Sequence, residues 1–235
     1  MRLLEDIIGT VRNRDAKVEE VVISPYWTAI CSVSCGIACT IGANLSSGMS
    51  EAGTLRGRKV ADLFELAFSW DFLEASIGVA ALNSVIAHEC KSAAFAPHMI
   101  PRARGKKIAV VGRFPFVERL REIAGELWVI EKEPHKGDFP DTAAEEFLPK
   151  CEVAIITGST IINKSLERLL DLSENAYTIV MGPSTPLSPV LFQYGANLVA
   201  GVRVKDCEQV LKEIAEGRKV ISDCPGIEQV VLEAA

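Results

Sequence analysis

The chain has 235 residues and a mass of 25.5 kDa; 49% of its residues are apolar and 24% are charged. This composition excludes a disordered or collagen-like chain, and the length is comfortable for two domains. The net charge is −6, so long-range electrostatics would repel a phosphate backbone, and we expect no nucleic-acid partner.

The amino-terminal stretch combines helical and strand-like periodicities. Residues 3–11 carry apolar side chains at helical spacing and are predicted to form an amphipathic helix. Residues 17–41 change to a period of two, which predicts an antiparallel hairpin with a tight turn at Ser34-Cys35-Gly36 and one buried face. A loop over residues 44–57 and two helices follow, the second running from Phe72 to Val85 or His88. We assign residues 1–95 to one α+β domain.

The first half of the chain also indicates in which compartment of the cell we expect the protein. The opening residues MRLLEDII carry acidic charge and do not resemble a signal peptide. The uncharged run from Val21 to Ser50 is long enough to test as a membrane span, but its apolar residues alternate and Pro25 interrupts it. We therefore expect a cytoplasmic protein with reduced thiols and no membrane contact.

The second half alternates short apolar strands with helices. Residues 96–106 are rich in proline and basic residues and have the composition of a linker. Residues 107–235 then contain five predicted strands separated by helical segments, which predicts a Rossmann-like parallel sheet with right-handed crossovers. The fold class is accordingly α/β with two domains.

The spacing of Gly112 and Glu131 is one candidate signal for a ligand. Ligands of open parallel sheets lie at the carboxyl ends of the strands, and an acid about 20 residues after the first glycine binds a ribose in dinucleotide sites. The turn after Gly112 has one of the three expected glycines, which argues against a pyrophosphate. A tight turn followed by a solvated Glu131 explains the pattern equally well.

Two loops with small hydroxyl residues follow later strands. Each combines a glycine with serine and threonine just before a helix, and their candidate residues are Gly158, Ser159, Thr160, Gly182, Ser184 and Thr185. Free backbone N–H groups at a helix start bind anions, so we expect the two loops to line one anion-binding pocket. Ordinary capping of the helices by serine or threonine is the alternative.

The loop after the second strand of this half is acidic. Glu131, His135 and Asp138 are the candidate metal ligands in it, since carboxylates and imidazole suit divalent transition metals. Their spacing is not diagnostic of any metal, and a solvated acidic loop is the alternative.

Cys31, Cys35 and Cys39 form a second candidate for metal binding. Their spacing lacks the C-x2-C pattern of a zinc site. With a turn at Cys35, Cys31 and Cys39 face each other on the apolar side of the hairpin, so we interpret them as buried core thiols. The remaining cysteines are scattered and indicate no site: Cys90, Cys151, Cys207 and Cys224.

Several segments together resemble a family described as "putative heavy-metal chelation" proteins. They are Pro25-Tyr26-Trp27-Thr28-Ala29, the stretch from Ile77 to Asn83, Gly137-Asp138-Phe139-Pro140, the stretch from Ile156 to Asn163, and Gly182-Pro183-Ser184-Thr185-Pro186-Leu187. The resemblance implies an amino-terminal domain similar to that of enolase, followed by a Rossmann-like domain. It also implies a role in metal handling, in the area of anaerobic corrinoid synthesis, without an established reaction.

The sequence therefore predicts a protein that binds a divalent transition metal or a metal complex in a cleft between its domains. In this interpretation the acidic loop coordinates the metal and the two hydroxyl loops hold an anionic group of a small-molecule ligand. An enzyme that uses a nucleotide or S-adenosylmethionine, bound by Glu131, is the first alternative, and a ligand-free scaffold is the second. The sequence decides neither the metal nor the oligomeric state, for which a homodimer is one candidate.

Overall fold

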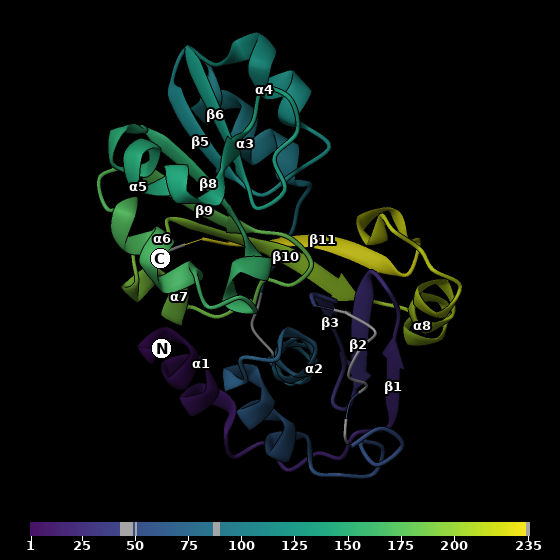
Figure 1. Cartoon of the computed structure of the whole chain (residues 1–235). Helices are drawn as coiled ribbons and strands as arrows, with labels where there is room; N and C mark the ends of the chain where they lie inside the picture. Colours follow the sequence, from purple (N-terminus) through teal and green to yellow (C-terminus); the bar gives the residue numbers. More distant parts are fainter. Residues whose placement is uncertain (43–48, 50, 87–89, 234–235) are drawn as a thin grey trace.

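The computed structural model describes residues 1–42, 49, 51–86 and 90–233 and shows a mixed α/β fold with two sheets (Figure 1). A small antiparallel sheet of three strands lies beside a larger, mostly parallel sheet of eight strands. The prediction of an α/β fold with a parallel sheet is confirmed. The finer likeness to the enolase amino-terminal domain and to Rossmann proteins stays a prediction.

The small sheet and three helical segments make up the first part of the chain. Their bounds are α1 (Arg2–Val11), β1 (Glu20–Ile23), β2 (Trp27–Cys31), β3 (Cys35–Cys39), the 3-10 helix η1 (Val60–Phe68) and α2 (Phe72–Asn83). The Asp71 carboxylate caps α2 by accepting from two of its first backbone N–H groups. The second half of α2 is buried on all sides, because it lies between η1 and the small sheet. The predicted loop over residues 44–57 lies partly outside the described residues, and His88 lies outside them.

The hairpin turns at residues 32–34, which corrects the predicted turn at Ser34-Cys35-Gly36. Cys31 is paired with Cys35, and Cys39 is paired with Trp27, so Cys31 and Cys39 do not face each other. Gly36 explains the register: a Cβ there would lie 2.1 Å from the Ala80 carbonyl oxygen, so this residue must sit in the strand, pressed against α2.

Both faces of this hairpin are covered, whereas the alternating pattern predicted one buried face. Ile30 and Ala38 belong to the core shared with α2, while Ala29 and Ile37 pack on residues of the carboxyl-terminal helix α8 (Cys207–Ala215). The polar residues of the hairpin are satisfied internally; the Thr28 and Thr40 hydroxyls, for example, are 2.9 Å apart.

The large sheet has the strand order β4-β11-β10-β9-β8-β5-β6-β7, in which β4 and β11 are the antiparallel members. Its strands are β4 (Lys91–Ser92), β5 (Lys107–Val111), β6 (Glu126–Glu131), β7 (Phe139–Pro140), β8 (Val153–Thr157), β9 (Tyr177–Met181), β10 (Leu198–Val204) and β11 (Ile227–Glu233). Its helices, besides α8, are α3 (Phe95–Ala103), α4 (Val117–Ile123), α5 (Ala144–Phe147), α6 (Leu166–Leu172) and α7 (Val190–Gln193). Helices α3 and α4 pack on one face, and α5, α6 and α7 pack on the other.

The segment predicted as a linker, residues 96–106, is helical over most of its length. It forms α3, whose Met99 and Ala103 are buried in the core on one face of the sheet. Strand β11, which the sequence pattern did not predict, brings the carboxyl-terminal segment back between β10 and β4. The division into domains at this segment stays a prediction, since β4 already belongs to the large sheet.

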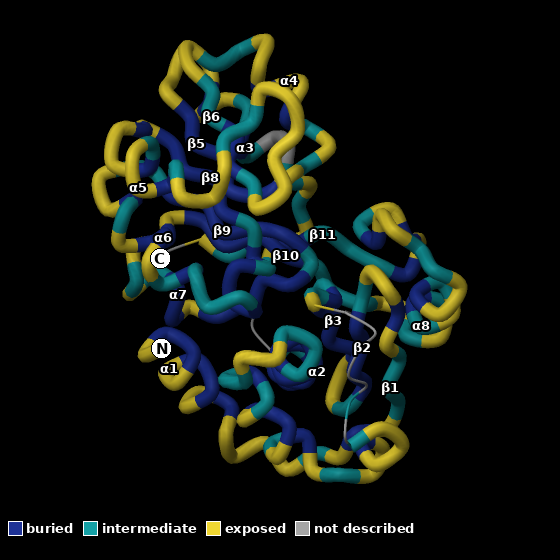
Figure 2. The backbone as a smooth tube through the Cα atoms, in the orientation of Figure 1, coloured by how far each residue is buried: buried dark blue, intermediate teal, exposed yellow. Residues whose placement is uncertain are grey.

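One apolar core joins the two parts of the chain. It extends from α1 and α2 to α6 and α7, and α1 contacts α7 directly. Figure 2 shows the central strands of the large sheet, such as β8 and β9, as buried, with exposed residues on the outer helices and turns. In the described residues no helix is long and apolar enough to cross a membrane.

Candidate metal centre

Three cysteines meet between the small sheet and α8. The Sγ atoms of Cys31, Cys35 and Cys207 all lie within 4.8 Å of one another. Among the residues that the structure describes, no other three His, Cys, Asp or Glu side chains gather their ligand atoms in this way. We refer to these three residues as the cysteine cluster.

Local structure places each of the three thiols. Cys31 ends β2 and Cys35 begins β3, so they are opposite each other across the hairpin turn. Cys207 is the first residue of α8, directly after the Asp206 cap. Figure 1 shows α8 beside the small sheet, which brings Cys207 to the hairpin from far along the chain. The surroundings are apolar and include Ile37 and Val210.

The three thiols influence one another's ionisation. The Cys31 and Cys207 sulfurs are 2.6 Å apart. Hydrogen bonding from Cys35, followed by that from Cys207, lowers the pKa of Cys31 despite its burial. Hydrogen bonding to Cys31 and burial raise the pKa of Cys35, while burial and the Cys31 contact raise that of Cys207 to about 12. Cys31 is therefore the first thiol to ionise, and the positive end of α8 favours thiolate character in the cluster.

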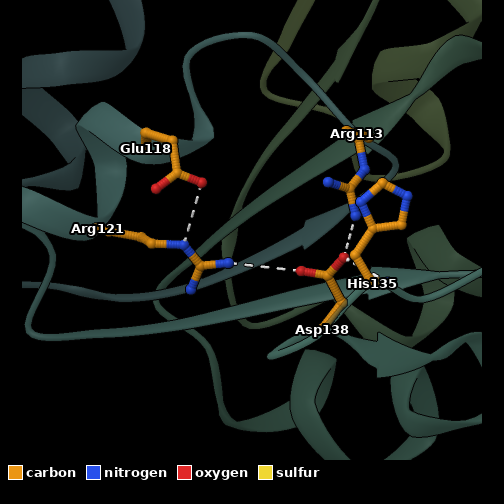
Figure 3. Close-up of polar contacts among 5 residues, drawn as sticks. All are labelled: Arg113, Glu118, Arg121, His135 and Asp138. Atoms are coloured by element: carbon orange, nitrogen blue, oxygen red, sulfur yellow. Dashed lines mark hydrogen bonds and ion pairs between the residues drawn. The ribbon is translucent and has the colours of Figure 1, made fainter.

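The residues of the acidic loop have a different arrangement (Figure 3). The Asp138 carboxylate is ion-paired with Arg113 and with Arg121, the latter at 3.4 Å, and also accepts from the His135 backbone N–H. The Asp138 side chain is only 3% exposed. Two guanidinium groups thus occupy the oxygens that a metal would need. Coordination by Glu131, His135 and Asp138 stays a prediction that requires these ion pairs to open.

The two hydroxyl loops lie side by side at the carboxyl edge of the sheet, as expected for neighbouring parallel strands. Gly158 packs directly on Thr185: a Cβ at Gly158 would lie 2.6 Å from the Thr185 backbone nitrogen. The Ser159 N–H donates to the Thr157 hydroxyl and the Thr185 N–H to the Gly182 carbonyl, so both amides have internal partners. The close approach that Gly158 permits is therefore between the two loops.

Ser184 connects the second loop to the first part of the chain. Its hydroxyl accepts from the Cys39 backbone N–H at 2.8 Å, and its carbonyl accepts from the Asn83 side-chain amide. The buried Asn83 Oδ1 and Thr185 Oγ1 atoms have no partner in the described part of the chain.

The two loops face different cavities rather than one. Thr185 and Pro183 line a cavity of about 270 Å³ beside Cys35 and Asn83. Ser159 and Thr160 line a cavity of about 480 Å³ that also contains Glu131. The two loops meet at Gly158, and the shared anion pocket expected from the sequence stays a prediction.

Sequence reasoning missed the cysteine cluster as a unit. The sequence pattern gives Cys207 no partner and predicts the turn two residues too late, which pairs Cys31 with Cys39. The one local signal is the position of Cys207 immediately after a helix cap, which in general favours a thiolate. In the structure, burial and the Cys31 contact outweigh it and raise the pKa of Cys207. Nothing local in the sequence indicates that this helix start meets the hairpin.

Two family models with the same description together match almost the whole chain. A family model, DUF364, described as "putative heavy-metal chelation", matches residues 95–231, and a second model with the same description, DUF4213, matches residues 5–86. An uncharacterized protein of Methanocaldococcus jannaschii is 29% identical over 165 residues, which cover 66% of this chain and 64% of that relative, less than two thirds of its length.

Solved structures of similar proteins support the same fold. A protein of unknown function from the DUF364 family of Desulfitobacterium hafniense is 30% identical, with a TM-score of 0.89 over 99% of this chain and 98% of that one. A second protein of unknown function from that family, from Pyrococcus horikoshii, is 23% identical, with a TM-score of 0.83 over 99% of this chain and 100% of that one.

Proposed function

The chain belongs to the DUF364 family, described as "putative heavy-metal chelation", and we propose that it binds one thiophilic heavy-metal ion through Cys31, Cys35 and Cys207. The observation that carries this proposal is the convergence of three thiol sulfurs within 4.8 Å of one another. The metal is the cargo of the protein in this proposal, and no reaction is assigned to it.

Ligand chemistry supports a soft metal at this position. Thiolates are soft ligands that select copper(I), zinc and similar thiophilic ions over hard cations such as magnesium or calcium. Sulfurs bound at about 2.3 Å to one tetrahedral ion lie about 3.8 Å apart, which falls within the span of the cluster. Binding requires the Cys31 and Cys207 sulfurs, now 2.6 Å apart, to separate by roughly 1 Å to reach that spacing.

The electrostatic surroundings also favour a cation. The charged groups that act most on Cys31 are the Glu19 and Glu20 carboxylates. At the cysteine cluster, a metal ion neutralises thiolates in an apolar position flanked by acids. At the acidic loop it would first have to displace two arginines from Asp138, so its binding free energy is more favourable at the cluster. This contrast favours the cysteine cluster over the acidic loop as the metal site.

The cluster also fits the expectation of a site between two parts of the chain. Cys31 and Cys35 come from the small sheet, whereas Cys207 comes from the helix between β10 and β11 of the large sheet. A metal bound here would link the hairpin to α8 and stabilise the folded chain by mass action.

Anaerobic titration of the reduced protein with Cd²⁺ tests the proposal. We expect one equivalent to bind with a thiolate-to-metal charge-transfer band, and each of Cys31→Ser, Cys35→Ser and Cys207→Ser to weaken binding by about a hundredfold or more. Cys39→Ser is the matched control, because Cys39 lies on the same strand as Cys35 but outside the cluster. Unchanged Cd²⁺ affinity in all three cluster variants would overturn the proposal.

A further inference from the structure

The cavity of about 480 Å³ lies at the position where the parallel sheet reverses its strand order. The chain passes from β5 to β6 on one side and then returns to place β8 on the other side of β5 (Figure 1). In open α/β sheets, ligands bind outside the carboxyl ends of the strands at such a switch point. This cavity contains the ends of all three strands, at Val111, Glu131 and Thr157.

The size and lining of the cavity suit a small organic molecule. Its volume lies within the range of about 300–1,000 Å³ that is typical of ligand pockets. One wall is apolar and includes Leu169 and Leu172 of α6. Polar groups from Ser159 and Asn163 also line it, and the Asn163 side-chain oxygen already accepts from Ser165. The Asn163 amide nitrogen has no partner among the described residues and can act as a donor.

Glu131 stands at a strand end in this cavity, whose other charged lining residues are Lys132, Asp141 and the ion-paired Glu145 and Arg168. It is half-buried at the last position of β6, and in the described part of the chain its side chain has no ion-pair partner. Burial raises the pKa of this carboxyl group, while a hydrogen bond from the Lys132 backbone and the nearby Arg113 act in the opposite direction. A carboxylate at the end of the second strand accepts hydrogen bonds from ribose hydroxyls in nucleotide-binding sheets.

The turn after β5 restricts the class of ligand. Gly112 has φ +105°, and a Cβ there would lie 2.7 Å from the Thr157 Cγ2 atom, so the fold itself requires this glycine. The following residues are Arg113 and Phe114, and the Phe114 ring stacks on Phe116. Without further glycines, the backbone cannot wrap a pyrophosphate as dinucleotide-binding turns do.

We propose that this cavity binds the ribonucleoside part of a small molecule, with the ribose hydroxyls donating to Glu131 and the base lying against the apolar wall of α6. The site is separate from the cysteine cluster, since the two share no residue. A free nucleoside and a larger ligand such as S-adenosylmethionine present the same ribose and base, and the experiment below distinguishes them.

Equilibrium dialysis with adenosine, guanosine, cytidine, uridine and S-adenosylmethionine tests this inference. We expect saturable binding of at least one of these probes. Its 2′-deoxy counterpart should bind about tenfold more weakly or worse, because one charge-assisted hydrogen bond is lost. Stronger binding of S-adenosylmethionine than of adenosine would identify the larger ligand, and equal or weaker binding would identify the nucleoside. Absence of saturable binding for all five probes would overturn the inference.

Two variants separate a specific site from a general effect on the fold. Glu131→Gln should weaken ribonucleoside binding about tenfold and remove the preference for ribose over deoxyribose, because a neutral amide is a poorer acceptor. Glu133→Gln is the control, since Glu133 is an exposed acid two residues further along. Both variants should keep wild-type circular dichroism and bind Cd²⁺ normally, so that failure of this inference is distinguishable from failure of the metal proposal. A ribose preference that survives in Glu131→Gln would contradict the inference.

Discussion

The cysteine cluster and the loop after β6 both gather side chains that can bind metals, in opposite surroundings. At the cluster, the thiols have mainly each other as partners, and the nearest strong charges are carboxylates. In the loop, Asp138 is already neutralised by Arg113 and Arg121. A metal can therefore enter the cluster by displacing protons, whereas in the loop it must displace arginines. Residues of ligand type therefore indicate a metal site only when their existing partners are weak.

Oxidation of the cysteine cluster should change Cd²⁺ binding more than any other treatment. Diamide converts two neighbouring thiols to a disulfide and is itself reduced to the hydrazine, and the Cys31 sulfur lies beside that of Cys207. We expect oxidised protein to lose its equivalent of Cd²⁺ completely, as measured by equilibrium dialysis and elemental analysis, and dithiothreitol to restore it. If mass spectrometry shows a disulfide within the cluster while Cd²⁺ still binds fully, the metal lies elsewhere.

The pH dependence of Cd²⁺ affinity should distinguish a site in the cysteine cluster from a site in the acidic loop. Because the pKa values of Cys35 and Cys207 are raised, the latter to about 12, both thiols are protonated near neutral pH and must release protons to bind a metal. Affinity should therefore rise with pH, by up to about a hundredfold per unit when two protons leave. A site of carboxylates and imidazole would reach its plateau above the ordinary imidazole range. A flat profile between pH 7 and pH 9 in isothermal titration calorimetry would favour the loop.

A third prediction concerns the contact between the two hydroxyl loops. Gly158→Ala should lower the free energy of unfolding by about 1–3 kcal/mol, because the added Cβ would lie 2.2 Å from the Thr185 hydroxyl oxygen and also close to its backbone. Chemical denaturation measures this loss. Gly9→Ala is the matched control: nothing lies within 4 Å of a Cβ there, and alanine favours the helix. Equal stabilities of the two variants would show that the loops do not pack as described.

The fold was largely predictable because its signals are local. The period-two pattern around Cys31 identified the hairpin, and buried apolar runs such as Val153–Thr157 identified the parallel strands. The turn position was not predictable, because it depends on Gly36 pressing against α2, a contact far away in the sequence. Moving the turn by two residues preserves which residues share a face, so the faces were correct while the partner of Cys31 was wrong.

The site was less predictable than the fold for the same reason. Cys207 joins the hairpin only because α8 packs on the small sheet, and no periodicity reports that packing. Asp138 has the residue type and loop position of a metal ligand, but its neighbour Arg121 comes from a helix earlier in the chain. Glu131 was the exception: its spacing from Gly112 already located it at the carboxyl end of a strand, where the structure has a cavity.

The smallest expected effect is that of Asp138→Asn, which tests the loop directly. The carboxylate is shielded from water while Arg113 and Arg121 are 45% and 37% exposed, so solvent screens much of the attraction. We expect the free energy of unfolding to fall by about 1 kcal/mol in urea denaturation. Glu118→Gln is the control, because Glu118 is 83% exposed and, among the residues that the structure describes, pairs with Arg121 alone. Cd²⁺ affinity should change by less than about twofold in both variants, since distant sites that share no partner act additively. A loss of Cd²⁺ binding in Asp138→Asn, with the cysteines reduced and intact, would show that the arginines yield to the metal and would move the site to the loop.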